Sequence, residues 1–303
     1  MLKQITEHIK FRNGVRHEEN QYLNLIESIL NDGELVKGRN GNTLTGFGAA
    51  MTFDLSKGCI PFLTTKQLAW KTCAKELFWF IKGCTDNQEL KNQNVKIWNE
   101  NSSRDYLDSI GLFDRSENDL GPVYGFQWRN FNATYRTCKD NYTGEGVDQL
   151  YEIIKALKDP EKKYSRRLIL TAWNPCQLDE MALPPCHLLA QFNVIKNRLS
   201  CTMYQRSCDL GLGVPFNIAS YSILTILISK ITDLDLGEFN YYLGNVHIYD
   251  DHIEELKEQI KRTPKPFPTL DILKKDNIED YNLDDLKINN YVYHPKIKME
   301  MRK

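Results

Sequence analysis

The sequence predicts an α+β fold in a single domain, and three observations lead to this prediction. The chain has 303 residues, 41% of them hydrophobic and 26% charged, which is ordinary for a globular protein with one large core. Segments with helical spacing of apolar residues and segments with apolar alternation are mixed along the chain. Residues 188–210 hold two long alternating runs around a short turn, which indicates antiparallel strands and favours the α+β class.

The first half of the chain contains two helical patterns and one strand pattern. Residues 22–30 place apolar side chains at helical spacing and end at "NDG", a typical C-terminal stop signal. Residues 41–55 alternate and are rich in glycine, as expected for a strand that follows a turn. Residues 70–83 predict a mostly apolar helix. Residues 99–147 are polar, and we expect loops there with a short helix at 103–109.

The second half of the chain predicts the other strands and helices. The dipeptide "KN" at 196–197 is a typical hairpin turn, so residues 188–210 predict a β-hairpin. An apolar segment predicts a core helix that begins at Pro215, because proline is favoured at the first helical position. The remaining expected elements are a helix at 148–158, a strand at 166–173, a strand leading into a helix at 240–250, an amphipathic helix at 251–262 and a proline-rich strand within 263–286.

The composition argues against several classes of function. The net charge of −1 gives no global electrostatic attraction to nucleic acid, which we do not expect as a main partner. The first twenty residues are polar and lack the apolar core of a signal peptide. The longest apolar run, 218–231, is too short and too rich in serine to span a bilayer. We therefore expect a cytoplasmic protein, with the nucleus as a second possible compartment, and no membrane partner.

The eight cysteines do not indicate a metal site. No C-x-x-C pair occurs, and the gaps between cysteines fit no zinc-binding pattern. In a reducing compartment most of them are expected to be small core residues. They lie at positions 59, 73, 84, 138, 176, 186, 201 and 208.

Cys186 differs from the other cysteines because of its neighbours in "LPPCH". Two prolines hold the backbone extended before it, at the beginning of a strand pattern. A thiol in this place is a candidate nucleophile, provided that a neighbouring group lowers its pKa. His187 is a poor candidate, since adjacent residues on a strand point to opposite faces. Arg206 in "YQRSCD" reaches Cys186 if the two strands pair, but a plain core cysteine remains the alternative.

Four arginines and one serine are candidates for binding a phosphate group. Arginine makes bidentate contacts to phosphate, and a serine hydroxyl adds a further hydrogen bond. Convergence of these side chains cannot be derived from the sequence, so isolated surface charges remain the alternative for each arginine. The residues are Arg39, Arg166, Arg167, Arg206 and Ser207.

Four other residues are candidates for recognising and protonating a ligand. Glu76 lies among large apolar residues, which would raise its pKa and make it an acid/base candidate, unless it faces the polar side of its helix. The amide of Asn217 matches the O4 and N3–H edge of a uracil, unless the residue is a helix cap. His247 and Tyr249 share one face of a strand and could hold a sugar hydroxyl, although a core histidine is the common alternative.

Seven motifs in order resemble the thymidylate synthase family, of the folate-dependent type with a cysteine nucleophile. The similarity runs from about residue 18 to 301, and the segment that begins "SRDYLDSIGLFDRSENDL" is similar to the longer insertion of the animal form. The resemblance implies one catalytic domain, 18–303, on a large twisted mixed β-sheet flanked by helices, which dimerises through the sheet. We expect residues 1–17 to be a disordered extension. The motifs are "DLGPVYGFQWR", "SRRLILTAWNP", "LPPCH", "YQRSCD", "GLGVPFNIASY", "HIY" and "IKMEM".

The resemblance implies reductive methylation of dUMP to dTMP. In this family the residue that matches Cys186 adds to C6 of the pyrimidine, and C5 then attacks the methylene group of 5,10-methylenetetrahydrofolate. The folate is both carbon donor and hydride source, so neither a metal nor a nicotinamide is implied. An obligate homodimer is implied as well, in which Arg166 and Arg167 reach the other subunit's site.

The resemblance also assigns site residues by position. The catalytic set is Cys186, Glu76, Tyr124, Arg206, Asp209 and Asn217. The dUMP-binding set is Arg39, Arg166, Arg167, His187, Gln205, Arg206, Ser207, Asn217, His247 and Tyr249. The folate-binding set is Ile97, Trp98, Asn101, Asp209, Leu212, Gly213, Phe216 and Met301.

The sequence departs from the family pattern at four places. The loop 38–44 is one residue shorter than usual, which affects the register of Arg39. Gln67 replaces an arginine, and Asn245 replaces an aspartate. The chain ends in "MEMRK" where the family has a small apolar pair, and this tail is expected to act as a lid over the folate. Asn245 and the altered tail keep a pyrimidine hydroxymethylase as an alternative function. A catalytically weak homologue kept for binding, for example to RNA, is a separate alternative.

Overall fold

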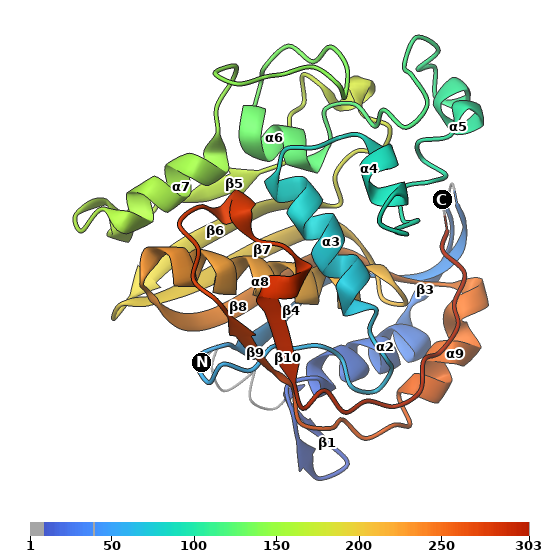
Figure 1. Ribbon diagram of the computed structural model, residues 1–303. Helices are drawn as coiled ribbons and strands as arrows, with labels where there is room; N and C mark the ends of the chain where they lie inside the picture. The colour runs from blue at the N-terminus through green and yellow to red at the C-terminus, as the bar shows by residue number, and fades with distance from the viewer. Residues whose placement is uncertain (1–8, 39, 303) are drawn as a thin grey trace.

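The computed structural model describes residues 9–38 and 40–302, and within them a six-stranded mixed sheet forms the centre of the molecule (Figure 1). Neighbouring strands of this sheet are antiparallel, except for β7 and β8, which are parallel. The predicted α+β fold in a single domain is confirmed. In sheet order the strands are β3 (Glu34–Gly38), β4 (Gly41–Asp54), β8 (Asp235–Tyr249), β7 (Arg198–Asp209), β6 (His187–Ile195) and β5 (Ile169–Thr171).

Helix α8 (Gly213–Thr232) explains the parallel pair. Parallel neighbours need a crossover, and α8 carries the chain from the end of β7 to the start of β8 while packing on both strands. The prediction of a core helix is confirmed, but its start is wrong by two residues. The helix begins at Gly213, so Pro215 is its third residue, where the missing N–H would have no helical partner in any case.

Among the described residues, one helix is long and apolar enough to cross a membrane, and it is α8. From the apolar run 218–231 we expected a segment too short to span a bilayer. This expectation about length was wrong, because the helix extends beyond the run and has 20 residues. Most of its side chains are buried between the sheet and the helices around it. The structure therefore uses α8 as the centre of the core.

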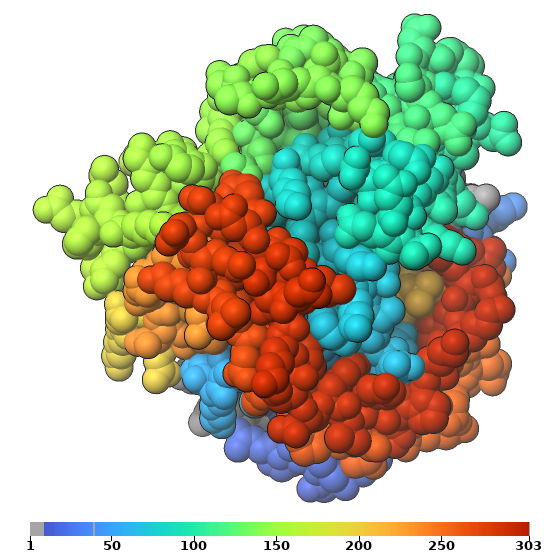
Figure 2. Space-filling model, in the orientation of Figure 1, coloured from blue at the N-terminus to red at the C-terminus, as the bar shows by residue number. Residues whose placement is uncertain are grey.

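The other helices surround this core. Helix α3 (Trp70–Ile81) packs on α8, and α6 (Tyr124–Asn130) packs on α3, while α2 (Asn20–Asp32) packs on β4 and β8. Together with C-terminal segments they cover the face of the sheet that is turned to the viewer in Figure 2. The prediction of loops over 99–147 missed α6, which is only seven residues long and has an aromatic, glycine-containing sequence. The expected short helix in that region is present as α5 (Arg104–Ser109).

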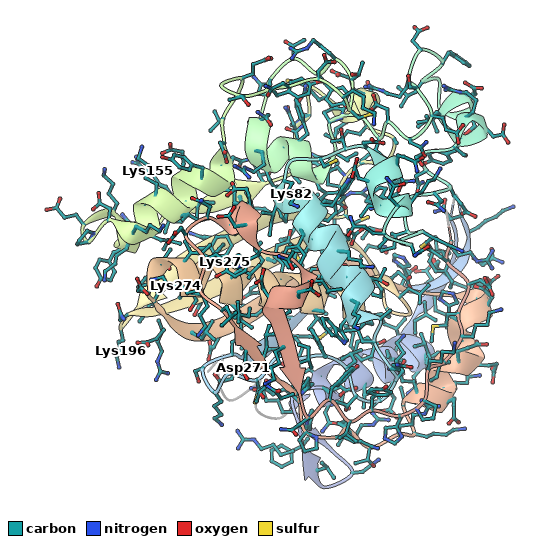
Figure 3. The ribbon with its side chains drawn as sticks, viewed as in Figure 1. Lys82, Lys155, Lys196, Asp271, Lys274 and Lys275 are labelled. Atoms are coloured by element: carbon teal, nitrogen blue, oxygen red, sulfur yellow. The ribbon has the colours of Figure 1, made fainter. Side chains whose placement is uncertain are left out.

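The predicted hairpin is confirmed as β6 and β7. Its turn residues Lys196 and Asn197 both have positive φ, 51° and 60°, as a two-residue type I′ turn requires. Figure 3 places Lys196 at the outer end of the hairpin. The pairing is regular except for a shift between His187 and Leu189, next to Cys186. This irregularity lies where β6 meets the site described below.

The remaining elements lie at the ends of the chain. Within the segment set apart as an N-terminal extension, β1 (Phe11–Arg12) and β2 (Val15–Arg16) form a small hairpin. Near the C-terminus the predicted strand and amphipathic helix are present, although the helix is shorter than expected. The other bounds are α4 (Asn87–Lys91), α7 (Gln149–Lys158), η1 (Lys162–Tyr164), η2 (Leu178–Glu180), η3 (Asp250–His252), α9 (Ile253–Gln259), β9 (Thr269–Ile272), η4 (Ile278–Asp280), η5 (Leu283–Asp285) and β10 (Leu286–Asn289).

One face of the sheet carries exposed apolar side chains, and we call it the open face. Phe47 of β4 is 83% exposed, and Tyr204 of β7 and Tyr242 of β8 are exposed beside it. These rings surround a shallow hollow with a floor of small residues at 48–50. Contiguous apolar surface of this kind marks an interaction site in many proteins.

Candidate active site

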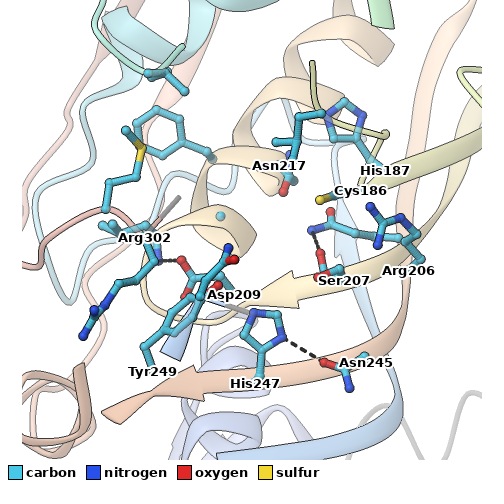
Figure 4. Close-up of a pocket in the computed structure, with 18 of the residues that line it drawn as sticks. Cys186, His187, Arg206, Ser207, Asp209, Asn217, Asn245, His247, Tyr249 and Arg302 are labelled. Atoms are coloured by element: carbon cyan, nitrogen blue, oxygen red, sulfur yellow. Dashed lines mark hydrogen bonds between the residues drawn. The ribbon is translucent and has the colours of Figure 1, made fainter. Parts of the chain in front are cut away.

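A cavity of about 670 Å³ lies where β7 and β8 end and α8 begins. It is large enough to enclose a small organic ligand. Figure 4 shows Asn217 of α8 on one side of this space and His247 and Tyr249 of β8 on the other. The cavity brings together 18 of the residues predicted from the sequence: Glu76, Ile97, Trp98, Asn101, Tyr124, Cys186, His187, Gln205, Arg206, Ser207, Asp209, Leu212, Gly213, Phe216, Asn217, His247, Tyr249 and Met301.

Three predicted residues are not among those that line the cavity. Arg39 lies outside the described residues. Arg166 and Arg167 are exposed next to β5, and neither reaches the cavity within the described part of this chain.

Cys186 and Arg206 are held together by the backbone, as the hairpin argument expected. The Arg206 N–H donates to the Cys186 carbonyl at 2.8 Å. The guanidinium donates to the carbonyls of Pro185 and Pro184 at 2.8 and 3.0 Å. The two prolines thus do more than extend the chain, because their free carbonyls fix the arginine beside the thiol (Figure 4).

The environment of the Cys186 thiol has opposing effects on its pKa. Burial raises the pKa, and the positive charge of Arg206 and hydrogen bonds from Tyr124 and Ser207 oppose this increase. Burial outweighs them, so the thiol of the free protein is protonated at neutral pH. Arg206 favours the thiolate, as expected, but does not by itself produce it. The Cys186 N–H also donates to the Tyr124 hydroxyl oxygen at 2.6 Å, which fixes the loop against α6.

His187 is a neutral, buried side chain. Burial lowers its pKa to about 3. Its Nδ1 lies 2.8 Å from the Tyr221 hydroxyl, and its ring stacks on Tyr124 at a centroid distance of 4.0 Å. A neutral imidazole cannot provide a positive charge for a Cys186 thiolate, so its contribution is to fix the two tyrosines.

Glu76 faces the cavity from α3, which excludes the alternative that it lies on an exposed polar stripe. Burial raises its pKa to about 7, and the hydrogen bond from Trp98 partly opposes this. The Trp98 Nε1–H donates to Glu76 Oε1 at 2.7 Å. A carboxyl group that titrates near neutral pH is suited to accept and return protons.

The beginning of α8 carries the residue proposed to recognise a pyrimidine. Asn217 lies one turn inside the helix, so the alternative of a helix cap is wrong. The two residues before α8 are held by Asp209, whose carboxylate accepts hydrogen bonds from the N–H groups of Gly211 and Leu212 at 2.8 and 3.2 Å. The Asn217 side chain lines the cavity, near Cys186 in Figure 4.

His247 and Tyr249 project from the same face of β8, and their rings lie 5.3 Å apart in an edge-on arrangement. Asn245 Oδ1 lies 2.9 Å from His247 Nδ1. Burial lowers the pKa of His247, and the charge of Asp209 only partly opposes this. The ring is therefore neutral at neutral pH.

Sequence reasoning assigned no role to several residues that line the cavity. Val36 lies in β3, for which the sequence predicted no strand, and Thr43 lies in β4, whose alternating pattern indicated only a strand, so no local signal marked either residue. Arg302 was noted only as a departure from the family pattern. Among the described residues, no three His, Cys, Asp or Glu side chains gather in a group that could hold a metal ion.

Comparison with known proteins agrees with this geometry. The family model for thymidylate synthase matches residues 20–303. The chain belongs to the thymidylate synthase family. It is 50% identical over 301 residues to the thymidylate synthase of Saccharomyces cerevisiae, covering 95% of this chain and 98% of that protein. It is 52% identical over 288 residues to the Homo sapiens thymidylate synthase, covering 94% of this chain and 91% of the human protein.

Some relatives in the family are longer. The chain is 53% identical over 290 residues to the bifunctional dihydrofolate reductase-thymidylate synthase of Leishmania amazonensis, covering 94% of this chain and 55% of that protein. The chain thus spans about half the length of these bifunctional relatives. The resemblance stated from the sequence motifs is confirmed.

Proposed function

We propose that this protein is a thymidylate synthase, which converts dUMP and 5,10-methylenetetrahydrofolate to dTMP and dihydrofolate. Family membership supports the proposal. The observation that carries it is the cavity itself, which combines Cys186 and Arg206 with a carboxyl group, Glu76, that titrates near neutral pH. The product is a thymine nucleotide for DNA synthesis.

The nucleotide would lie between α8 and β8. Arg206 and Ser207 would bind the phosphate from β7, with Arg39 as a further member of that group, and Gln205 would lie beside them in the nucleotide site. The Asn217 amide would accept from N3–H and donate to O4, which selects uracil over cytosine. Neutral His247, together with Tyr249, would hold the 3′-hydroxyl.

The covalent step begins at Cys186. Its thiolate forms a bond to C6, and the electrons of the C5–C6 double bond move toward O4. Tyr124 and Glu76 line the same cavity, and we assign to them the proton transfers at C5 and O4. Because the free thiol is protonated, its proton must leave when the nucleotide binds.

The carbon transfer then balances without another reagent. C5 attacks the methylene carbon of the folate, loses its proton, and releases tetrahydrofolate as the exocyclic methylene forms. A hydride from C6 of that tetrahydrofolate reduces the methylene to a methyl group, and Cys186 departs. Folate would pack on the cavity residues at the start of α8 and opposite them: Ile97, Trp98, Asn101, Asp209, Leu212, Gly213, Phe216 and Met301.

We propose that the working form is a homodimer joined through the open face. This face exposes Phe47, Tyr204 and Tyr242, a surface that two copies could bury against each other. Dimerisation would also give Arg166 and Arg167 a role, because they would reach the phosphate in the partner's cavity.

Mixing an Arg166→Ala variant with a Cys186→Ala variant tests this exchange of arginines. In a mixed dimer, the site that keeps Cys186 receives an intact Arg166 from the other subunit, so one complete site is retained. Activity that does not rise on mixing would contradict the exchange.

We further propose that the protein works in the cytoplasm, because dUMP and folate are soluble, charged substrates. Nucleic acid is not a main partner in this proposal. Cell fractionation with an antibody against the chain tests the location, and recovery with membranes would contradict it.

Turnover of the purified protein tests the main proposal. It would be mixed with dUMP and methylenetetrahydrofolate, with dihydrofolate followed by absorbance and the nucleotide identified by mass. Formation of dTMP and dihydrofolate, lost in Cys186→Ala, is the expected result. Hydroxymethyl-dUMP without dihydrofolate would instead establish the hydroxymethylase alternative, and bound dUMP without any product would favour the binding-only alternative.

A further inference from the structure

The C-terminal tail, residues 299–302, lies against the cavity and is attached to it at two points. Met301 and Arg302 are among the residues that line the cavity. At the first point, the Nε2–H of buried His252 donates to the Glu300 carbonyl at 2.7 Å. Met299 packs nearby, since a Cβ added to Gly211 would lie 3.1 Å from its sulfur.

At the second point, the Arg302 guanidinium binds two aspartates of η3. Nη2 lies 2.9 Å from Asp251 Oδ2 and 3.4 Å from Asp250 Oδ1. Nε donates to Asp251 Oδ1 at 3.2 Å, so the contact with Asp251 is bidentate. All three side chains are partly exposed, between 35% and 42%.

The guanidinium also lies close to the start of β4. A Cβ built on Gly41 would lie 3.9 Å from Arg302 Nη1, an ordinary van der Waals distance, so the two groups are near neighbours. Asn42 of β4 donates to Asp250 Oδ2 at 3.3 Å. Arg302 and its aspartate partners therefore lie where three segments that are distant in sequence meet: the tail, η3 and the start of β4.

We propose that Arg302 is a positioning residue that forms an ionic latch with Asp250 and Asp251. The latch holds the tail on the cavity before any ligand is present, and so places Met301 in the folate part of the site. The identity of the ligand rests on the proposed function, whereas the latch itself does not. The latch acts on the binding of the folate, the larger of the two proposed substrates, and leaves the covalent step at Cys186 unchanged.

The partial exposure of the latch determines the size of the effect. Partly exposed ion pairs on one guanidinium shift an equilibrium roughly three- to tenfold. Raising the ionic strength from about 0.01 M to about 1 M shortens the screening distance from roughly 30 to 3 Å and removes most of this attraction. The latch is thus weak enough to open for ligand exchange.

Exopeptidase digestion of the ligand-free protein tests the latch without using enzyme activity. A carboxypeptidase specific for basic residues must first remove Lys303 and then releases Arg302 only from a detached tail, and mass spectrometry follows the release of Arg302. Asp250→Asn/Asp251→Asn leaves the tail sequence intact, and we expect release roughly three- to tenfold faster than in the native chain at low salt, with no difference at high salt. Equal rates at low salt would overturn the proposal.

A matched control is Lys298→Gln. Lys298 is a cation of the same tail, but it pairs with Glu300 at 2.8 Å and is 86% exposed. Removing its charge should leave the release of Arg302 at the native rate. Acceleration equal to that of the aspartate variant would mean that general charge, and not the latch, holds the tail.

Steady-state kinetics test the consequence for binding. In Arg302→Gln we expect a KM for methylenetetrahydrofolate roughly three- to tenfold higher, with kcat and the Kd for dUMP unchanged, and partial recovery in Arg302→Lys. A lower kcat with an unchanged KM would overturn the assigned role. If the native protein makes no dTMP, the proposed function fails, and the digestion result still decides whether the latch exists.

Discussion

The hydrogen bond from Trp98 to Glu76 gives a quantitative test of the site. Replacement by phenylalanine, Trp98→Phe, keeps an aromatic ring and removes the N–H that donates to Oε1 at 2.7 Å, together with one ring of the indole. This donor lowers the Glu76 pKa, which burial has raised to about 7, so its removal must raise the pKa further. The limb of the kcat–pH profile that reports Glu76 should therefore move to higher pH, whichever protonation state is active.

The size of the shift follows from the strength of the bond. A hydrogen bond to a charged group contributes about 1.5–3 kcal/mol, and about 1.36 kcal/mol corresponds to one pKa unit, which gives roughly one to two units. Glu76 is only partly buried, so water replaces some of the lost donor. We expect a shift of about one unit.

The assay is kcat measured with both substrates saturating between about pH 5.5 and 9.5, a span that covers the pKa of Glu76 and its shift. Trp98 also borders the proposed folate region, so the KM for the folate is expected to change in Trp98→Phe. The quantity to compare between variants is therefore kcat. Trp79→Phe is a matched control, because its Nε1–H donates to the Asp86 carbonyl at 3.1 Å. A limb that stays in place in Trp98→Phe, or that moves equally in both variants, would refute the assignment of that limb to Glu76.

Four further substitutions test separate parts of the protein. Cys186→Ala should abolish turnover and leave dUMP binding measurable by calorimetry, whereas Arg206→Ala should lose both turnover and binding. Native-like turnover in Cys186→Ala would exclude the thiol as the nucleophile. Asn217→Asp should lower the preference for dUMP over dCMP by tenfold or more, roughly the value of one or two hydrogen bonds, and an unchanged ratio of kcat/KM would remove Asn217 as the recognising residue. Phe47→Asp on the open face should raise the dimer dissociation constant roughly thirtyfold or more, and sedimentation showing an unchanged dimer would place the interface elsewhere.

The sequence predicted the local parts of the site best. The hairpin could be derived from two alternating runs and a two-residue turn, and this pairing alone brought Arg206 beside Cys186. The start of α8 was two residues off, because proline is tolerated throughout the first turn and therefore marks it only loosely.

Other features depend on contacts that a local pattern does not contain. Helix α6 holds Tyr124 against Cys186, but its seven residues carry too few helical repeats to be recognised. The acidic pair at η3 and the arginine near the end of the chain are 52 and 51 positions apart, so their contact could not be seen before folding. The effect of burial on the Cys186 pKa likewise depends on the whole surrounding cavity.

The pairing of β4 with β8 has a consequence for the order in which the protein folds. Thr43 lies opposite Tyr249, and Thr45 lies opposite His247, across about 200 intervening residues. Closing a loop of this length is slow, because the chain loses conformational entropy before it gains the contacts that compensate for the loss. We infer that the nucleotide site matures last. Helical circular dichroism should return before dUMP binding during refolding, and simultaneous recovery would contradict this order.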